Sequence, residues 1–215
     1  MKPVLHPLGD SGITVALAEV ASRDTTRSCR HAADRLRSAG LAHVEDVVAA
    51  YTAVTVFYDS LHASYEQVSK EISLVLERKP QRREYKSPVR THVIPVVYDG
   101  ADLDDVAELT KLSRERIIEI HSSRTYDVDL LGFVPGFAYL SEIDPRLRLA
   151  RRSQPRPRVP AGSVAIAAEM TGVYPFDTPG GWHLLGRTTA VMFDPRRDEP
   201  SLLKPGDKVK FEPAT

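Results

Sequence analysis

The most specific stretch of the chain reads Leu131-Gly132-Phe133-Val134-Pro135-Gly136-Phe137-Ala138-Tyr139-Leu140. Two glycines, one proline and three aromatic residues stand within these ten positions. Glycine adopts backbone geometry that is closed to other residues, and aromatic side chains offer stacking faces or the wall of an apolar pocket. A bent strand that enters a β-bulge, with its aromatics in the core, explains the stretch equally well. The binding candidates in it are Phe133, Pro135, Gly136, Phe137 and Tyr139.

Three runs further along the chain are also rich in glycine and proline: Val159-Pro160-Ala161-Gly162-Ser163, Thr171-Gly172-Val173-Tyr174-Pro175 and Thr178-Pro179-Gly180-Gly181-Trp182. Exposed backbone amides in a Pro-Gly-Gly turn can hold an oxyanion or a phosphate. The alternative is an ordinary turn between barrel strands, with the tryptophan buried. We favour this alternative when the Pro-Gly-Gly turn is considered by itself. The runs together favour a binding cleft, with candidates Pro160, Gly162, Ser163, Thr171, Tyr174, Pro179, Gly180, Gly181 and Trp182.

Residues 145–168 contain no acidic side chain, although six arginines stand among them at positions 146, 148, 151, 152, 156 and 158. A guanidinium group binds carboxylate or phosphate through two parallel hydrogen bonds. The alternative is a solvated rim whose arginines pair with acids elsewhere, such as Asp99, Asp104 and Asp105. We favour that pairing for most of them and an anion contact for one or two. The candidates for such a contact are Arg152 and, further along, Arg187.

Composition excludes several classes of function. The 215 residues carry 29 Lys and Arg against 29 Asp and Glu, so net charge gives no support to nucleic-acid or membrane binding. Cys29 is the only cysteine, so no intramolecular disulfide forms and a reducing cytoplasm is expected. The start of the chain lacks the apolar run of a signal peptide, and no stretch approaches the roughly 18 apolar residues of a membrane span.

Motifs for nucleotides and metals are also missing. No glycine is followed by lysine, so there is no P-loop, and the seven histidines form no H-E-x-x-H pattern. We therefore predict no metal site in this chain.

Apolar spacing predicts two architectures. Residues 1–79 carry strands on both sides of a turn at 8–12 and again at 43–50 and 53–58, with two amphipathic helices. This pattern predicts an α+β sandwich with both helices on one face. The basic, proline-flanked residues 80–90 are the predicted linker. Residues 91–215 begin with a strand and two short helices, opened by Asp102 and Ser113, and continue as short apolar runs cut by Gly and Pro. They predict a mainly-β barrel or sandwich.

The same runs carry a resemblance. The chain resembles the family of 5-oxoprolinase B subunits, also called allophanate hydrolase subunit 1 or KipI-like, and the likeness covers nearly the whole chain. It rests on His121-Ser122, Tyr126, 131–140, 156–164, 171–175 and 178–182, and in the first half on Leu8-Gly9-Asp10-Ser11, Tyr51-Thr52 and 55–59. The chain departs from the family pattern at 165–169, where alanines stand among the small residues that are usually glycine.

The resemblance implies an N-terminal α+β sandwich domain followed by a mainly-β, cyclophilin-like barrel. It implies that the chain forms a heteromer with the C subunit of 5-oxoprolinase and works with a separate A subunit. The implied activity is the ATP-dependent opening of 5-oxoproline to L-glutamate, with ATP and Mg²⁺ at a site shared with a partner. We expect His121, Tyr126 and Arg187 to take part in catalysis, although a lone histidine is more often structural than catalytic.

Two alternatives remain open at this point. Some family members are described as inhibitors of a sensor histidine kinase, which would need an exposed apolar patch rather than an anion-binding cleft. Related domains also form part of the carboxyltransferase or allophanate hydrolase-type enzymes that act on urea-like amides, which would need biotin from a partner.

Overall fold

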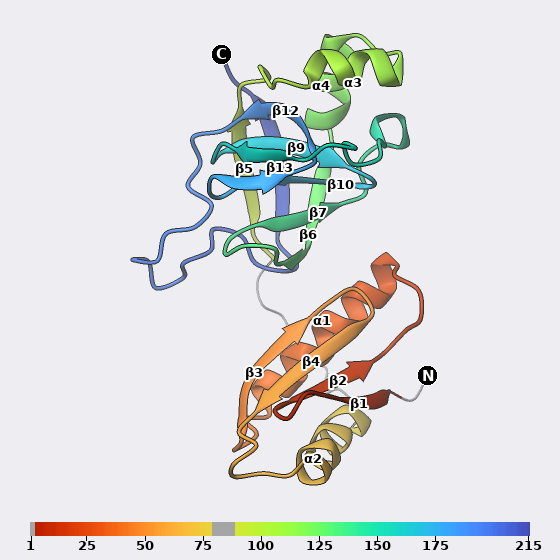
Figure 1. Cartoon of the computed structure of the whole chain (residues 1–215), viewed down its shortest axis with the longest axis vertical. Coiled ribbons are helices and arrows are strands. Elements are labelled where there is room, and N and C mark those ends of the chain that lie inside the picture. The colour runs from red at the N-terminus through yellow and green to blue at the C-terminus, as the bar shows by residue number, and fades with distance from the viewer. Residues whose placement is uncertain (1–2, 79–88) are drawn as a thin grey trace. The chain divides into compact units, whose positions relative to one another are not determined.

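A computed structural model describes residues 3–78 and 89–215 (Figure 1). The chain divides into two compact units, Met1–Pro88 and Val89–Thr215. The predicted linker at 80–90 lies outside the described residues, apart from its last two positions.

The first unit contains a four-stranded antiparallel sheet in the order β1-β2-β4-β3. Its strands are β1 (Val4–Leu8), β2 (Gly12–Ala16), β3 (Val44–Ala49) and β4 (Ala53–Tyr58). Ile13 lies opposite Val56, and Val15 lies opposite Val54. All four side chains are fully buried, because alternate residues of a strand point to the same face.

Two helices bury their apolar faces against this sheet. α1 (Arg23–Ser38) begins at Ser22 and α2 (Tyr65–Glu77) begins at Ser64, and each serine accepts a hydrogen bond from a backbone amide in the first turn of its helix. Cys29 and Leu36 of α1 share one apolar cluster with Ile72 of α2 and with the strands. Cys29 is therefore a packed core thiol, as its place on the apolar helix face predicts.

The second unit is a seven-stranded mixed sheet that is nearly closed into a barrel. Its strand order is β12-β9-β10-β7-β6-β13-β5, and only β13 and β5 are parallel. Val97 and Arg187 exchange two backbone hydrogen bonds of 2.9 Å, which join the two ends of the sheet. The strands are β5 (Thr91–Val96), β6 (Thr125–Leu131), β7 (Ala138–Ser141), β9 (Ser163–Ala167), β10 (Met170–Val173), β12 (His183–Arg187) and β13 (Lys208–Pro213).

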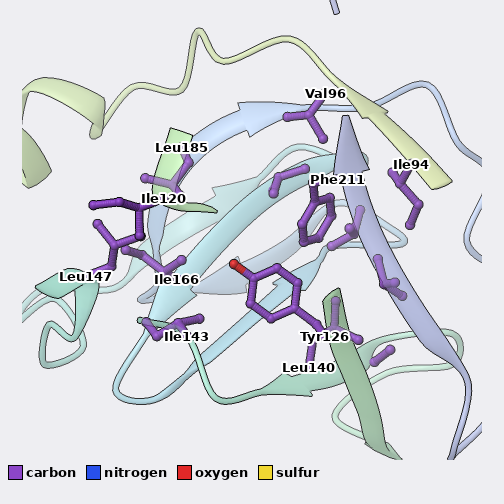
Figure 2. Close-up of a cluster of buried hydrophobic side chains, with 14 of the residues drawn as sticks. Ile94, Val96, Ile120, Tyr126, Leu140, Ile143, Leu147, Ile166, Leu185 and Phe211 are labelled. Carbon is purple, nitrogen blue, oxygen red and sulfur yellow. The ribbon is translucent and has the colours of Figure 1, made fainter. Parts of the chain in front are cut away.

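Shorter elements cover the barrel. They are α3 (Leu103–Thr110), α4 (Arg114–Ser122), a 3-10 turn at Pro145–Leu147, and a two-stranded sheet of β8 (Arg156–Val159) and β11 (Thr178–Gly180). α3 packs beside β12 and α4 beside β13. Buried side chains from the strands and helices meet inside the barrel, with Tyr126 and Phe211 among them (Figure 2).

The prediction that Asp102 caps a helix is only partly right. Asp102 stands at the start of α3 as predicted, but its side chain makes no capping hydrogen bond with the helix. Its carboxylate turns instead toward two arginines and β12. Among the described helices, none is long and apolar enough to cross a membrane.

Candidate functional site

Phe137 is the centre of an aromatic cluster in the second unit. The rings of Phe133, Tyr139, Tyr174 and Trp182 each meet it edge to face, with ring centroids 5.0–5.5 Å apart. Edge-to-face packing of this kind stabilises aromatic clusters. The structure thus brings together aromatics from three separate runs of the sequence. Most of the cluster is buried, but Phe133 is 59% exposed and Tyr139 is partly exposed.

The loop before β7 lines an open hollow of about 420 Å³. Residues 131–136 form one side of the hollow, and Phe193 and Ser201 form the other. Gly136 has φ +79°, and a Cβ there would lie 2.6 Å from Cβ of Phe193. Phe133 also has a positive φ, 71°, which is an uncommon conformation for a residue with a bulky side chain. Phe133 thus lines a pocket, as one interpretation of this stretch predicts. Phe137 lies in the core, as the other interpretation predicts.

The Gly180-Gly181 turn lies directly over Tyr174. A Cβ at Gly180 would overlap the hydroxyl oxygen of Tyr174, so a side chain there would force Tyr174 or the backbone to shift. Gly181 accepts a 2.8 Å hydrogen bond at its carbonyl from the backbone amide of Arg152. Burial raises the pKa of Tyr174, against the opposing effect of a hydrogen bond from the Trp182 backbone. The phenol beneath the turn is therefore neutral at physiological pH.

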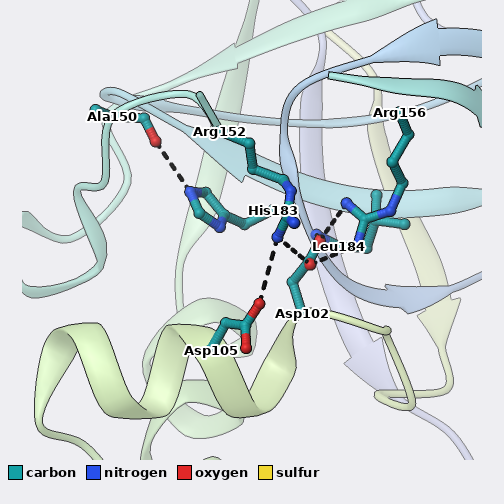
Figure 3. Close-up of polar contacts among 7 residues, drawn as sticks. All are labelled: Asp102, Asp105, Ala150, Arg152, Arg156, His183 and Leu184. Atoms are coloured by element: carbon teal, nitrogen blue, oxygen red, sulfur yellow. Dashed lines mark hydrogen bonds and ion pairs between the residues drawn. The ribbon is translucent and has the colours of Figure 1, made fainter. Parts of the chain in front are cut away.

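Asp102 holds two arginines beside this turn (Figure 3). Arg156 donates to both carboxylate oxygens at 2.8 and 2.6 Å, and Arg152 donates to one of them at 2.6 Å. The amide of Leu184 donates as well, at 2.8 Å. Burial acts to raise the pKa of Asp102, but the bonds from Arg156 and Leu184 and the charges of both arginines together lower it. Asp102 is 1% exposed, so this is a buried, charged hub.

The rim interpretation is confirmed for most of the arginines. Arg146 pairs with Asp144, Arg148 with Glu169, and Arg158 with Asp177. Of the predicted acidic partners, Asp105 pairs with Arg152, while Asp99 and Asp104 pair with Arg187 and Arg114. The two predicted anion contacts, Arg152 and Arg187, thus both carry acidic partners. An anion bound at either arginine would therefore compete with the paired carboxylate for the guanidinium group.

His121 and Tyr126 lie in the barrel core. Thr171 donates its hydroxyl to the carbonyl of Ala165 at 2.9 Å, so it accepts from Nε2 of His121, also at 2.9 Å. Nδ1 of His121 then accepts from the hydroxyl of Tyr98 at 2.7 Å. Burial lowers the pKa of His121 to about 3. The imidazole is therefore neutral, with both nitrogens bonded.

Tyr126 completes this buried group. Its hydroxyl donates to the backbone carbonyl of His121 at 2.7 Å, and its ring is 1% exposed. The His121 ring stacks on Phe211 with centroids 4.7 Å apart. Tyr126 and Phe211 belong to the main core cluster (Figure 2).

The remaining candidates lie in the loop that precedes β9, at Ser163, which is the first residue of β9, and in β11. Gly162 has φ +80° and donates its amide to the carbonyl of Tyr174 at 2.7 Å. Ser163 donates its hydroxyl to the carbonyl of Pro160 at 2.7 Å, so that hydroxyl is used within its own turn. Pro179 is exposed in β11.

Sequence reasoning missed Asp102 and His183 as parts of this region. His183 donates Nε2–H to the carbonyl of Ala150 at 2.9 Å, which anchors the loop before Arg152 (Figure 3). One sequence signal pointed to a partner such as Asp102: Arg152 and Arg156 have no acidic residue near them in the sequence, so they need a distant one. In residues 3–78 and 89–215, no three His, Cys, Asp or Glu side chains gather into a group that could hold a metal ion.

Known proteins share this sequence pattern. The family model described as the carboxyltransferase domain, subdomain C and D, matches residues 3–203. The chain is 37% identical over 219 residues to the B subunit of the 5-oxoprolinase of Bacillus subtilis (strain 168), covering 96% of this chain and 91% of that protein.

Solved structures share the fold. The crystal structure of TTHA0988 superposes with a TM-score of 0.84 at 38% identity over 95% of this chain. This chain spans only 40% of the length of that solved chain. The Kluyveromyces lactis urea amidolyase has a similar fold, with a TM-score of 0.79 at 18% identity over 99% of this chain and 15% of its own.

Proposed function

The chain belongs to the family of 5-oxoprolinase B subunits, whose carboxyltransferase domain model it matches from residue 3 to residue 203, and on that premise we propose that it is the B subunit of a heteromeric, ATP-dependent 5-oxoprolinase. In this proposal the complex opens 5-oxoproline to L-glutamate, and this chain is inactive by itself. The observation that carries the proposal is the 37% identity to a protein of that name over 96% of this chain.

The chemistry explains why ATP is required. A lactam carbonyl is a poor electrophile because the ring nitrogen donates electron density to it. ATP supplies a phosphoryl group to the carbonyl oxygen, which turns that oxygen into a leaving group. Water then adds to the carbonyl carbon, the carbon–nitrogen bond breaks, and the nitrogen takes up a proton. A second water releases the phosphate, so glutamate, ADP and phosphate are the products.

The chain's own residues contribute binding and orientation in this proposal. The aromatic cluster around Phe137 offers apolar faces for a small ring, with Tyr139 partly exposed beside it. A Cβ at Gly181 would make only ordinary contacts at 3.7 Å, so in this proposal the turn offers a ligand open backbone at Gly181. We propose that His121 and Tyr126 act as positioning residues, because the core encloses both and their polar atoms bond to Thr171, Tyr98 and each other.

A nucleotide site made by this chain alone does not fit the residues. The sequence has no glycine–lysine pair and so no P-loop, and the described residues gather no three carboxylate, imidazole or thiolate groups that would hold a metal without a nucleotide. Mg²⁺ that accompanies a nucleotide needs only one or two protein carboxylates besides the phosphates. We therefore propose that the C subunit completes the site, and we assign no step to a metal held by this chain.

The test is an omission experiment. The chain is purified together with its C and A partner subunits, and the formation of glutamate and ADP from 5-oxoproline and ATP is measured with each protein left out in turn. We expect activity only in the complete mixture. A stable complex that forms no glutamate would overturn the proposal. The same complex would then be assayed for inhibition of a histidine kinase and for biotin-dependent carboxylation of urea.

A further inference from the structure

Arg151 differs from the other arginines of its stretch. Five of the six arginines in 145–168 form ion pairs, through Asp144, Glu169, Asp102 (which holds two of them) and Asp177. Arg151 is exposed and forms no hydrogen bond or ion pair with any residue in 3–78 or 89–215. Its guanidinium group is therefore available to an outside anion.

The backbone on both sides of Arg151 is held in place. Ala150 accepts a hydrogen bond from the ring of His183 at 2.9 Å (Figure 3). The Arg152 amide donates to the carbonyl of Gly181 at 2.8 Å. One residue earlier, Leu149 accepts from the amide of Ala168 at 2.6 Å. An exposed side chain on an anchored backbone loses less entropy when it binds a ligand than one on a loose loop.

The anchor places Arg151 at the Gly180-Gly181 turn. A Cβ at Gly181 would lie 3.7 Å from the carbonyl oxygen of Arg152, so the two loops are in contact. The charge of Arg151 also acts on the phenol of Tyr174, which lies beneath that turn. The nearby acids are already engaged, because Asp102 binds both Arg152 and Arg156.

Arg152 and His183, which anchor this segment, each carry an unused polar atom. Nδ1 of His183 and Nε of Arg152 are buried, and neither has a hydrogen-bond partner among the described residues. His183 is only 6% exposed, and because its Nε2 carries the proton, Nδ1 is an acceptor while Arg152 Nε is a donor. Buried polar groups without partners are rare and are concentrated at functional or hydrated sites.

We infer that Arg151 binds an anionic group of the substrates, a carboxylate or a phosphate, at the rim of the Gly180-Gly181 turn. This inference rests on the proposed function and adds a residue that the sequence pattern did not select. A guanidinium fork recognises either group through paired hydrogen bonds. The carboxylate would come from the lactam and the phosphate from the nucleotide.

The test is steady-state kinetics of the reconstituted complex of all three proteins. Arg151→Ala is compared with Arg151→Lys and with Arg158→Ala, which removes an exposed arginine of the same stretch that is paired with Asp177. We expect Arg151→Ala to raise one KM by about ten- to a hundredfold, Arg151→Lys to restore part of the loss, and Arg158→Ala to change neither KM. A higher KM for 5-oxoproline identifies the carboxylate, and a higher KM for ATP identifies the phosphate. Unchanged KM values for both substrates would overturn the inference.

A second readout separates this inference from the proposed function. If the wild-type complex forms no glutamate, the proposed function fails, and the inference is tested by binding. The Nε–H resonance of Arg151 in the complex is then followed during titration with 5-oxoproline and with inorganic phosphate, and Arg151→Ala assigns it. A saturable shift with either anion supports the inference. A resonance that moves with neither anion overturns it.

Discussion

Asp102 joins the start of α3, the loop of Arg152 and Arg156, and β12 through one buried carboxylate. Asp102→Asn would leave Arg156 without its acidic partner and Arg152 with only the exposed Asp105. We expect it to lower the free energy of unfolding by about 3 kcal/mol, as is typical when one partner of a buried ion pair is removed. Urea unfolding measures the effect. The control Asp105→Asn removes an exposed partner of Arg152 and should cost less than about 1 kcal/mol. Equal losses would contradict the buried-hub account.

The buried His121 makes stability depend on pH. Burial lowers its pKa to about 3 from a normal value of 6.5, so the unfolded chain takes up this proton at a higher pH than the folded chain does. The free energy of unfolding should therefore fall as the pH drops from 6.5 toward 3, by at most about 1.4 kcal/mol per pH unit from this residue. Urea unfolding at several pH values measures the slope. His121→Gln should make the slope shallower by about one proton. An unchanged slope would show that other groups cause the dependence.

Gly180 and Gly181 allow the same substitution to be compared at a crowded position and at an open one. A Cβ at Gly180 would overlap the hydroxyl of Tyr174, whereas a Cβ at Gly181 would make ordinary contacts at 3.7 Å. Gly180→Ala should therefore lower the free energy of unfolding by about 1–3 kcal/mol through overpacking, and Gly181→Ala by less than about 1 kcal/mol. Thermal unfolding of both variants checks this order. A reversed order would mean that Tyr174 does not lie beneath the turn.

At the scale of elements, the turn of the β9–β10 hairpin shows what one departure from the family pattern costs in stability. Ala167 and Met170 are paired, so Ala168 and Glu169 form the turn, and Ala168 has φ +49°. Alanine in this left-handed region costs about 1 kcal/mol relative to a relaxed conformation, and glycine does not incur that cost. We expect Ala168→Gly to raise the free energy of unfolding by up to about 1 kcal/mol.

The neighbouring alanine is the control for that prediction. Ala167 is fully buried in the aromatic cluster, so Ala167→Gly removes a packed methyl group and adds backbone freedom. It should lower the free energy of unfolding by about 1–2 kcal/mol in the same urea experiment. A loss of stability in both variants would contradict the strained-turn interpretation.

The elements themselves were largely predictable from the sequence. Alternation of apolar residues located the strands of the first unit, and serine caps with apolar stripes located its helices, because these signals act over a few residues. The partners of Asp102 could not be predicted from short-range sequence patterns. Its position predicted the start of a helix, but its partners lie 50 to 82 positions away along the chain. No short-range pattern encodes such pairings.

At the scale of the whole molecule, barrel closure was also beyond local patterns. It depends on Val97 meeting Arg187, and the register between such distant strands follows from the packing of the complete unit. The glycine-rich runs did predict a shared region, and the structure joins Phe137, Tyr174 and Trp182 there. His121 and Tyr126 belong to the motifs that carry the resemblance, and the core encloses both, with His121 bonded to Thr171 of one of these runs. Catalytic roles for the candidate residues stay predictions.

In our proposal, this chain is required for the ATP-dependent opening of 5-oxoproline. The most direct measurement is to add the purified chain to a mixture of the A and C partner subunits and to follow glutamate and ADP together. We expect glutamate formation to rise with added chain until it saturates at a fixed ratio of the three proteins, with ADP formed in step. Glutamate formation that is independent of the added chain, or absent at saturation in a verified complex, would contradict the proposal.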